Sequence, residues 1–66
     1  MRVLGIDPGV SETGWAVLED GPALLGSGIL RTAAGLPLPD RLLAIHEGLS
    51  RVLRESRPDA VAEEMF

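Results

Sequence analysis

The feature that most constrains the fold is a single amphipathic segment, from about Pro39 to about Ser56, with three apolar segments before it and one after it. Its apolar residues recur at helical spacing and form one face of an α-helix. They are Leu42, Ile45, Leu49 and Val52. Pro39 suits a first helical turn and Asp40 suits the positive end of the helix dipole. Gly48 costs about 1 kcal/mol relative to alanine in a helix interior, so we expect a close contact between helix and sheet there.

The remaining apolar segments predict four strands. They cover Arg2–Asp7, Gly14–Leu18, Ala23–Thr32 and Asp59–Met65. Short turns separate the first three, which predicts an antiparallel meander, and the helix then carries the fourth strand back, parallel to the first. The expected fold class is therefore α/β, a mixed sheet built in the order β-β-β-α-β. One helix covers only one face of such a sheet, so we expect residues 1–66 to be the N-terminal part of a single domain.

Composition narrows the classes of protein without selecting one. The chain has 66 residues, no cysteine and a net charge of −4, and its six basic residues are all arginines. These numbers allow one domain at most and exclude disulfides and thiolate metal sites within it. An acidic chain without lysine is a poor phosphate binder, unless its carboxylates hold a metal ion where DNA is cut. The sequence contains neither the apolar run of a signal peptide nor one long enough to span a membrane. We therefore expect a soluble, cytoplasmic protein without membrane contact.

Carboxylates stand at the ends of two strands that we expect to be neighbours. Asp7 ends the first strand, and Glu63-Glu64 lies at the end of the fourth. Carboxylate oxygens are preferred ligands of Mg²⁺ and Mn²⁺, and metal ions held in this way activate water for phosphodiester hydrolysis. The simpler interpretation is a turn residue before Pro8-Gly9 and two solvated glutamates, and spacing alone favours it.

Three further residues are candidates for contact with DNA. Ser11 and Thr13 follow the first turn and have hydroxyls that suit a phosphate, although such residues more often satisfy hydrogen bonds of the turn itself. Phe66 suits stacking on a base, or equally a place in the core or at the chain end. Trp15, the only tryptophan, is expected in the core or covering a face of the sheet.

Taken together, these segments resemble the RuvC family of Holliday junction resolvases. Residues 4–15, which read Leu-Gly-Ile-Asp-Pro-Gly-Val-Ser-Glu-Thr-Gly-Trp, are similar to the family's opening motif. Residues 25–32 are similar to its third strand, residues 38–49 to its first helix and residues 58–66 to its second acidic motif. The likeness runs in order along essentially the whole chain, which makes it far more specific than any one motif.

The resemblance implies an RNase H-like fold and a structure-specific endonuclease that resolves four-way DNA junctions by metal-dependent hydrolysis in recombination and repair. It implies Mg²⁺ as cofactor, with Mn²⁺ as a substitute, a homodimer, and a branch-migration helicase complex as partner. Asp7 matches the first of the family's four acidic positions, and the last two have no counterpart in the 66 residues. We therefore expect this chain by itself to be inactive.

The second acidic position falls at Glu63 or Glu64. Spacing from Pro58 points to Glu64, whereas spacing from Phe66 points to Glu63 and leaves Ala62 in the apolar position before it. We favour Glu63 slightly, because choosing Glu64 would put a charged residue into a buried place, and we keep both. Because strand residues alternate between faces, only one of them is expected to reach a metal ion.

Other classes of protein remain open at this level. The Gly-Ile-Asp-x-Gly opening also occurs in YqgF-type RNA-processing nucleases and in the actin and sugar-kinase fold, where this loop contacts the phosphate of ATP. A third possibility is a truncated relative that binds DNA or a partner strand without cutting.

Overall fold

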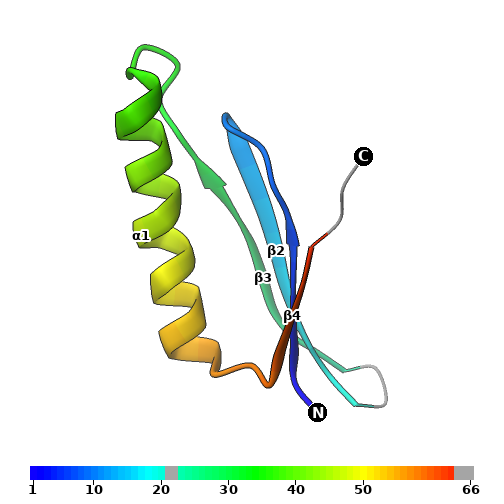
Figure 1. The fold of residues 1–66 in the computed structure, drawn as a ribbon. Helices are drawn as coiled ribbons and strands as arrows, with labels where there is room; N and C mark the ends of the chain where they lie inside the picture. Colours follow the sequence, from blue (N-terminus) through cyan, green and yellow to red (C-terminus); the bar gives the residue numbers. More distant parts are fainter. Residues whose placement is uncertain (21–22, 64–66) are drawn as a thin grey trace.

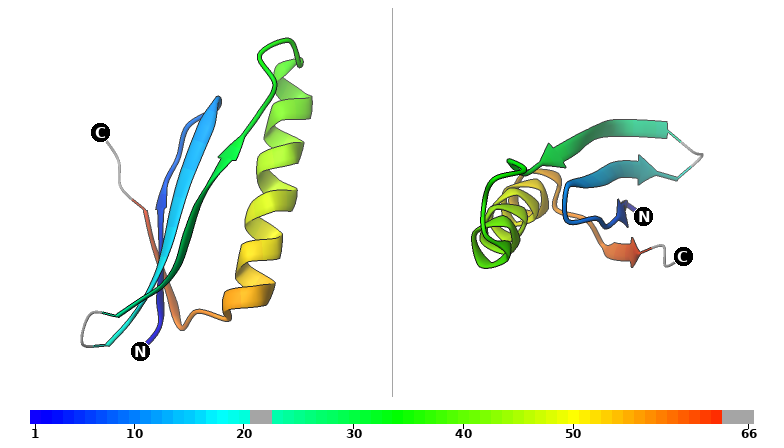
Figure 2. Two further views of the ribbon diagram at one scale, coloured as in Figure 1. Left: turned by 180° about the vertical axis from the view of Figure 1, so that it is seen from behind. Right: turned by 90° about the horizontal axis from the view of Figure 1, so that it is seen from above.

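The structure is a computed structural model that describes residues 1–20 and 23–63. Its elements are β1 (Val3–Asp7), β2 (Glu12–Glu19), β3 (Ala23–Arg31), α1 (Leu38–Ser56) and β4 (Ala60–Glu63). The strands form one sheet in the order β3-β2-β1-β4, with α1 lying against one face (Figures 1 and 2). β1 is antiparallel to β2 and parallel to β4. The predicted mixed sheet and the order of its elements are confirmed.

The strand boundaries differ from the predicted ones. β2 starts at Glu12 rather than Gly14, because its ladder with β3 extends from the pair Glu12–Arg31 to the pair Glu19–Ala23. A β-bulge between Val17 and Leu18 shifts the register of that ladder. The length of β3 sets where β2 begins and ends, because each additional residue pair satisfies backbone groups that would otherwise need water.

The core lies between the sheet and the helix and is small. Leu4, Val17 and Val52 are buried, and Ile6 and Trp15 pack against them. The register explains the grouping, because Leu4 lies opposite Val17 and Ile6 opposite Trp15, so all four share the helix-covered face. Leu4, at 0% exposure, is the centre of this cluster, and burying such a side chain contributes about 1.5–3 kcal/mol.

Two glycines permit close packing on this face. The indole of Trp15 lies over Gly28, where a Cβ would come within 2.9 Å of three of its ring atoms. A Cβ at Gly48 would lie 2.8 Å from a methyl carbon of Leu30. The prediction that Gly48 marks a close contact between helix and sheet is therefore confirmed.

The predicted apolar face of α1 is only partly used. Val52 is buried and Ile45 and Leu49 are half-buried, but Leu42, on the same predicted face, is 52% exposed. The helix contacts β3, and within residues 1–20 and 23–63 nothing covers the side of the helix that carries Leu42 and Leu53. No helix in this described part has the length and apolar character needed to cross a membrane.

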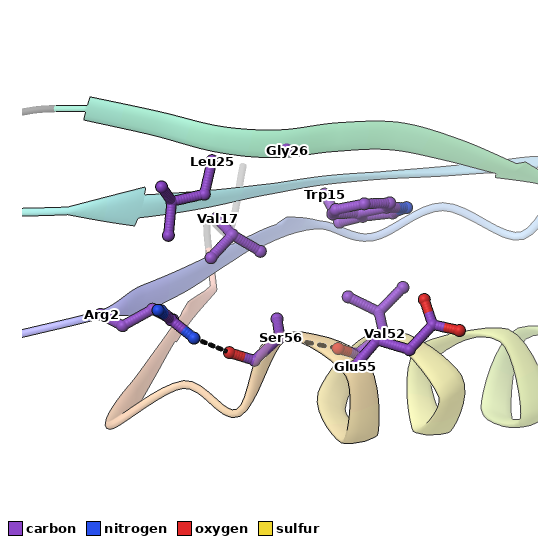
Figure 3. Close-up of a pocket in the computed structure, with 8 residues that line it drawn as sticks. All are labelled: Arg2, Trp15, Val17, Leu25, Gly26, Val52, Glu55 and Ser56. Carbon is purple, nitrogen blue, oxygen red and sulfur yellow. Dashed lines mark hydrogen bonds between the residues drawn. The ribbon is translucent and has the colours of Figure 1, made fainter.

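Arg2 connects the end of the helix to the sheet. Its guanidinium donates a hydrogen bond to the carbonyl oxygen of Ser56 (2.7 Å), at the edge of a groove of about 250 Å³ between α1 and the sheet (Figure 3). Its backbone N–H donates to a carboxylate oxygen of Asp59 (2.7 Å), and its carbonyl accepts from the N–H of Asp59 (2.8 Å). The helix ends at Ser56 and is capped by Arg57, which has a left-handed φ of 48°. These contacts place the beginning of β4 beside β1.

The packing of Trp15 against Gly28 predicts that Gly28→Ala destabilises the fold. The added methyl group must displace the indole, and overpacking of this kind costs about 1–3 kcal/mol. Urea unfolding followed by the fluorescence of Trp15 measures the change. Gly35→Ala is the matched control, because no atom lies within 4 Å of its Cβ position. Equal unfolding midpoints for the two variants would contradict this account of the packing.

Candidate active site

Asp7 lies at the end of the interior strand β1, on the face of the sheet that α1 does not cover. It is exposed, and its partner across the ladder to β2 is Gly14. A Cβ built on Gly14 would lie 3.8 Å from the Cβ of Asp7, so both residues point to the same side. The carboxylate therefore stands free on the open face of the sheet.

Small residues surround Asp7 on this face and form a shallow hollow of about 400 Å³. Its lining consists of Gly5, Ile6, Asp7, Gly14, Trp15, Ala16, Gly28 and Ala62. Gly5 lies between Ala16 on one neighbouring strand and Ala62 on the other. A floor of glycine and alanine lets a bulky group approach the backbone closely beside the carboxylate. The alternation of small residues in the sequence was the signal for this hollow, and our sequence reasoning missed it.

Glu63 lies on the opposite face from Asp7. The parallel ladder pairs Gly5 with Ala62 and Ile6 with Glu63, and residues paired in this way point to the same side of a sheet. Ala62 accordingly lines the hollow, whereas Glu63 shares the side of Ile6 and is exposed there. The predicted meeting of Asp7 and Glu63 in one cluster is thus not present in this register. Glu64 and Phe66 lie outside the described residues.

Asp7 is the one carboxylate that lines the hollow within the described ranges. Those ranges contain no group of three or more acidic, histidine or cysteine side chains that could hold a metal ion. Mg²⁺ is commonly bound by one or two carboxylates together with waters and substrate phosphates. Asp7 fits such a site as one oxygen ligand.

The turn after Asp7 is organised by Thr13. Its side chain is 1% exposed, and its hydroxyl donates to the carbonyl of Gly9 (2.7 Å) and accepts from the N–H of Gly9 (3.3 Å). This is the turn role that the sequence left open as the alternative, and a hydroxyl engaged in this way is not free for a phosphate. Ser11 is exposed beside it, so its contact with DNA stays a prediction.

A second threonine and an ion pair at this end of the sheet were missed by sequence reasoning. Thr32 follows β3, and its hydroxyl donates to the carbonyl of Val10 (2.7 Å) while its N–H donates to the carbonyl of Ser11 (3.0 Å). Arg31 pairs with Glu12 at 3.2 Å, and both side chains are exposed, so the pair contributes no more than about 1 kcal/mol. These contacts depend on the register of β2 with β3, and no local signal reveals that register.

Comparison with known proteins agrees with this geometry. The profile of the family described as crossover junction endodeoxyribonuclease RuvC matches residues 3–66. Proteins of that name from Nitrobacter hamburgensis and Afipia carboxidovorans are 51% and 49% identical over 70 aligned residues that include the entire chain. The Thermus thermophilus RuvC structure in complex with Holliday junction substrate aligns with a TM-score of 0.92 at 36% identity, over 98% of this chain and 42% of that one.

These matches define the class of fold and the family together. The sheet and helix correspond to the first half of the RuvC fold, and the chain belongs to the RuvC family. It spans 41% of the length of each of the two curated relatives. The alternatives of an RNA-processing nuclease and of a kinase-like protein are not favoured by these matches.

The geometry predicts that Asp7 and Thr13 differ in their effect on stability. Asp7→Asn should change the free energy of unfolding by less than about 0.5 kcal/mol, because the carboxylate is exposed and accepts no hydrogen bond from the described residues. Thr13→Val preserves volume but removes two hydrogen bonds to the partly buried backbone groups of Gly9, which costs about 1–3 kcal/mol. Urea unfolding of both variants measures the difference. A loss at Asp7 as large as that at Thr13 would make Asp7 a structural residue.

Proposed function

We propose that this chain forms the first part of the active site of a structure-specific DNA endonuclease that cuts four-way junctions by metal-dependent phosphodiester hydrolysis. The observation that carries the proposal is Asp7, exposed at the end of an interior strand above the hollow of small residues, in a fold that aligns with the junction-bound Thermus thermophilus structure. The relatives' name, crossover junction endodeoxyribonuclease, supports the same activity.

Within this site, Asp7 would hold the cation, and we propose Mg²⁺ with Mn²⁺ as a substitute. A divalent ion so bound activates water and stabilises the leaving oxygen. The chain contributes an exposed carboxylate beside a hollow lined mostly by glycine and alanine, which leaves room for a phosphate beside Asp7. With a net charge of −4 and no lysine, it contributes little to general phosphate binding, so affinity for DNA must come from residues elsewhere in the protein.

We further propose Glu64, rather than Glu63, as the second carboxylate. The fourth strand expected from the sequence runs to Met65, and residues two apart in a strand point the same way, so that expectation assigns Glu64 to the same side as Ala62. A buried Glu63 would disfavour Glu64 as the ligand, and in this chain Glu63 is exposed on the side of Ile6. This choice reverses the slight preference for Glu63 that sequence spacing supported.

A homodimer, a branch-migration helicase complex as partner and a cytoplasmic location remain proposals that rest on the family. The solved relative bound to a Holliday junction substrate supports four-way DNA as the ligand. Of these, the DNA substrate is the proposal that the geometry of this chain can test directly.

The proposed activity is tested in a chimera in which this chain replaces the matching N-terminal part of the Nitrobacter hamburgensis relative. We expect Mg²⁺-dependent nicking of a four-way junction but not of linear duplex, and none from the 66-residue chain alone. Asp7→Asn should lower the rate more than about 100-fold, since losing a ligand costs more than losing an outer-shell partner. Asp40→Asn, on the first turn of the distant helix, is the control. An Asp7→Asn chimera that retains full activity would refute the assignment.

The choice between the two glutamates is tested in the same chimera. Glu64→Gln should abolish nicking, whereas Glu63→Gln should leave the rate within a few-fold, because Glu63 points away from Asp7. Each substitution keeps side-chain size and removes one charge, so each controls for the other. Loss of activity in Glu63→Gln alone would mean that β4 pairs with β1 in a register shifted by one residue.

A further inference from the structure

The hydroxyl of Thr13 sits where a purely apolar side chain would serve the core equally well. Thr13 is at 1% exposure on the helix-covered side of β2, in the same row of alternating residues as Trp15 and the buried Val17. Valine has nearly the same shape and suits a buried strand at least as well. A buried hydroxyl is costly unless it is hydrogen-bonded, so its presence here indicates a use other than packing.

That use is at the turn directly after Asp7. The same oxygen satisfies both backbone groups of Gly9, as donor to its carbonyl and as acceptor from its N–H. Gly9 admits no side chain, because a Cβ there would overlap the backbone oxygen of Glu12. Thr13 is also the neighbour of Gly14, the ladder partner of Asp7. The hydroxyl therefore closes the turn immediately beyond the last pair that holds Asp7.

Thr32 holds the other half of the same turn from outside, through the carbonyls of Val10 and Ser11. The two threonines thus restrain residues 9–11 from both sides. Thr32 is bonded at the exposed surface, whereas Thr13 is at 1% exposure and its bonds to Gly9 are partly buried, so water replaces the first hydroxyl more readily than the second.

We propose that Thr13 is a positioning residue for Asp7: its hydroxyl fixes the turn at Gly9 and so holds the Asp7 carboxylate in the orientation that binds the divalent ion. This inference rests on the proposed function of Asp7 and adds a residue that does not itself touch the metal. A carboxylate at a strand end would otherwise sample several orientations, and a ligand ordered in advance binds its ion more tightly.

The test is a Mn²⁺ titration of the chimera, followed by broadening of the amide signals of residues 7 and 9 in NMR spectra. We expect Thr13→Val to need about tenfold more Mn²⁺ for the same broadening, at the lower end of effects seen for outer-shell partners. Thr13→Ser retains the hydroxyl and should restore the wild-type response. Val52→Ala is the control for stability, because it weakens the core at the helix, away from the turn.

The outcomes separate the two proposals. Equal Mn²⁺ responses in Thr13→Val and wild type overturn the positioning role, whether or not the chimera cuts junctions. An equal loss in Val52→Ala also overturns it, because the effect would then follow stability. If the chimera cuts no junction but Thr13→Val and Asp7→Asn both weaken the Mn²⁺ response, the nuclease proposal fails and the positioning role stands.

Discussion

The structure depends on the pairing of β1 with a strand on each side. β1 is antiparallel to β2 and parallel to β4, so it is an interior strand although it starts the chain. An interior strand has its backbone groups satisfied on both edges, which makes its position the least free to move. Leu4 anchors it from the helix side at 0% exposure. The backbone of Asp7, at the end of this strand, is held by its pairing with Gly14.

Alternate side chains of β1 point to opposite faces of the sheet and have different roles there. Leu4 and Ile6 point to the helix and build the core, whereas Gly5 and Asp7 point to the open side and form the hollow. Stability and candidate chemistry thus use interleaved residues of one strand, and a shift of one residue in register would exchange them. The same rule applied to β4 places Ala62 beside the hollow and Glu63 away from it.

The β1–β2 turn is held by more than local preference. Pro8 fixes one backbone angle, but a buried hydroxyl from β2 and a hydroxyl from just beyond β3 hold the residues that follow. Contacts from three parts of the sequence therefore converge on the segment next to Asp7. These contacts restrain the backbone of residues 9–11, directly after Asp7.

Much of the fold was predictable from local patterns. The apolar periodicity of residues 42–52 indicated the helix, the turn residues separated the first strands, and the crossover implied a last strand parallel to the first. The mid-helix glycine even indicated a close contact, and Leu30 supplies it. The family resemblance located Asp7, because the motif that carries it consists of consecutive residues and does not depend on strand register.

The sequence by itself determined the elements, their order, the family and Asp7 as the first candidate ligand. Only the tertiary structure decided that Leu42 is exposed, that Thr13 serves the turn, and that Glu63 points away from Asp7. The physical reason is common to all three. Each depends on which residue of one strand or helix lies opposite which residue of another, and that register is set by the summed packing and hydrogen bonding of the entire sheet rather than by any local segment.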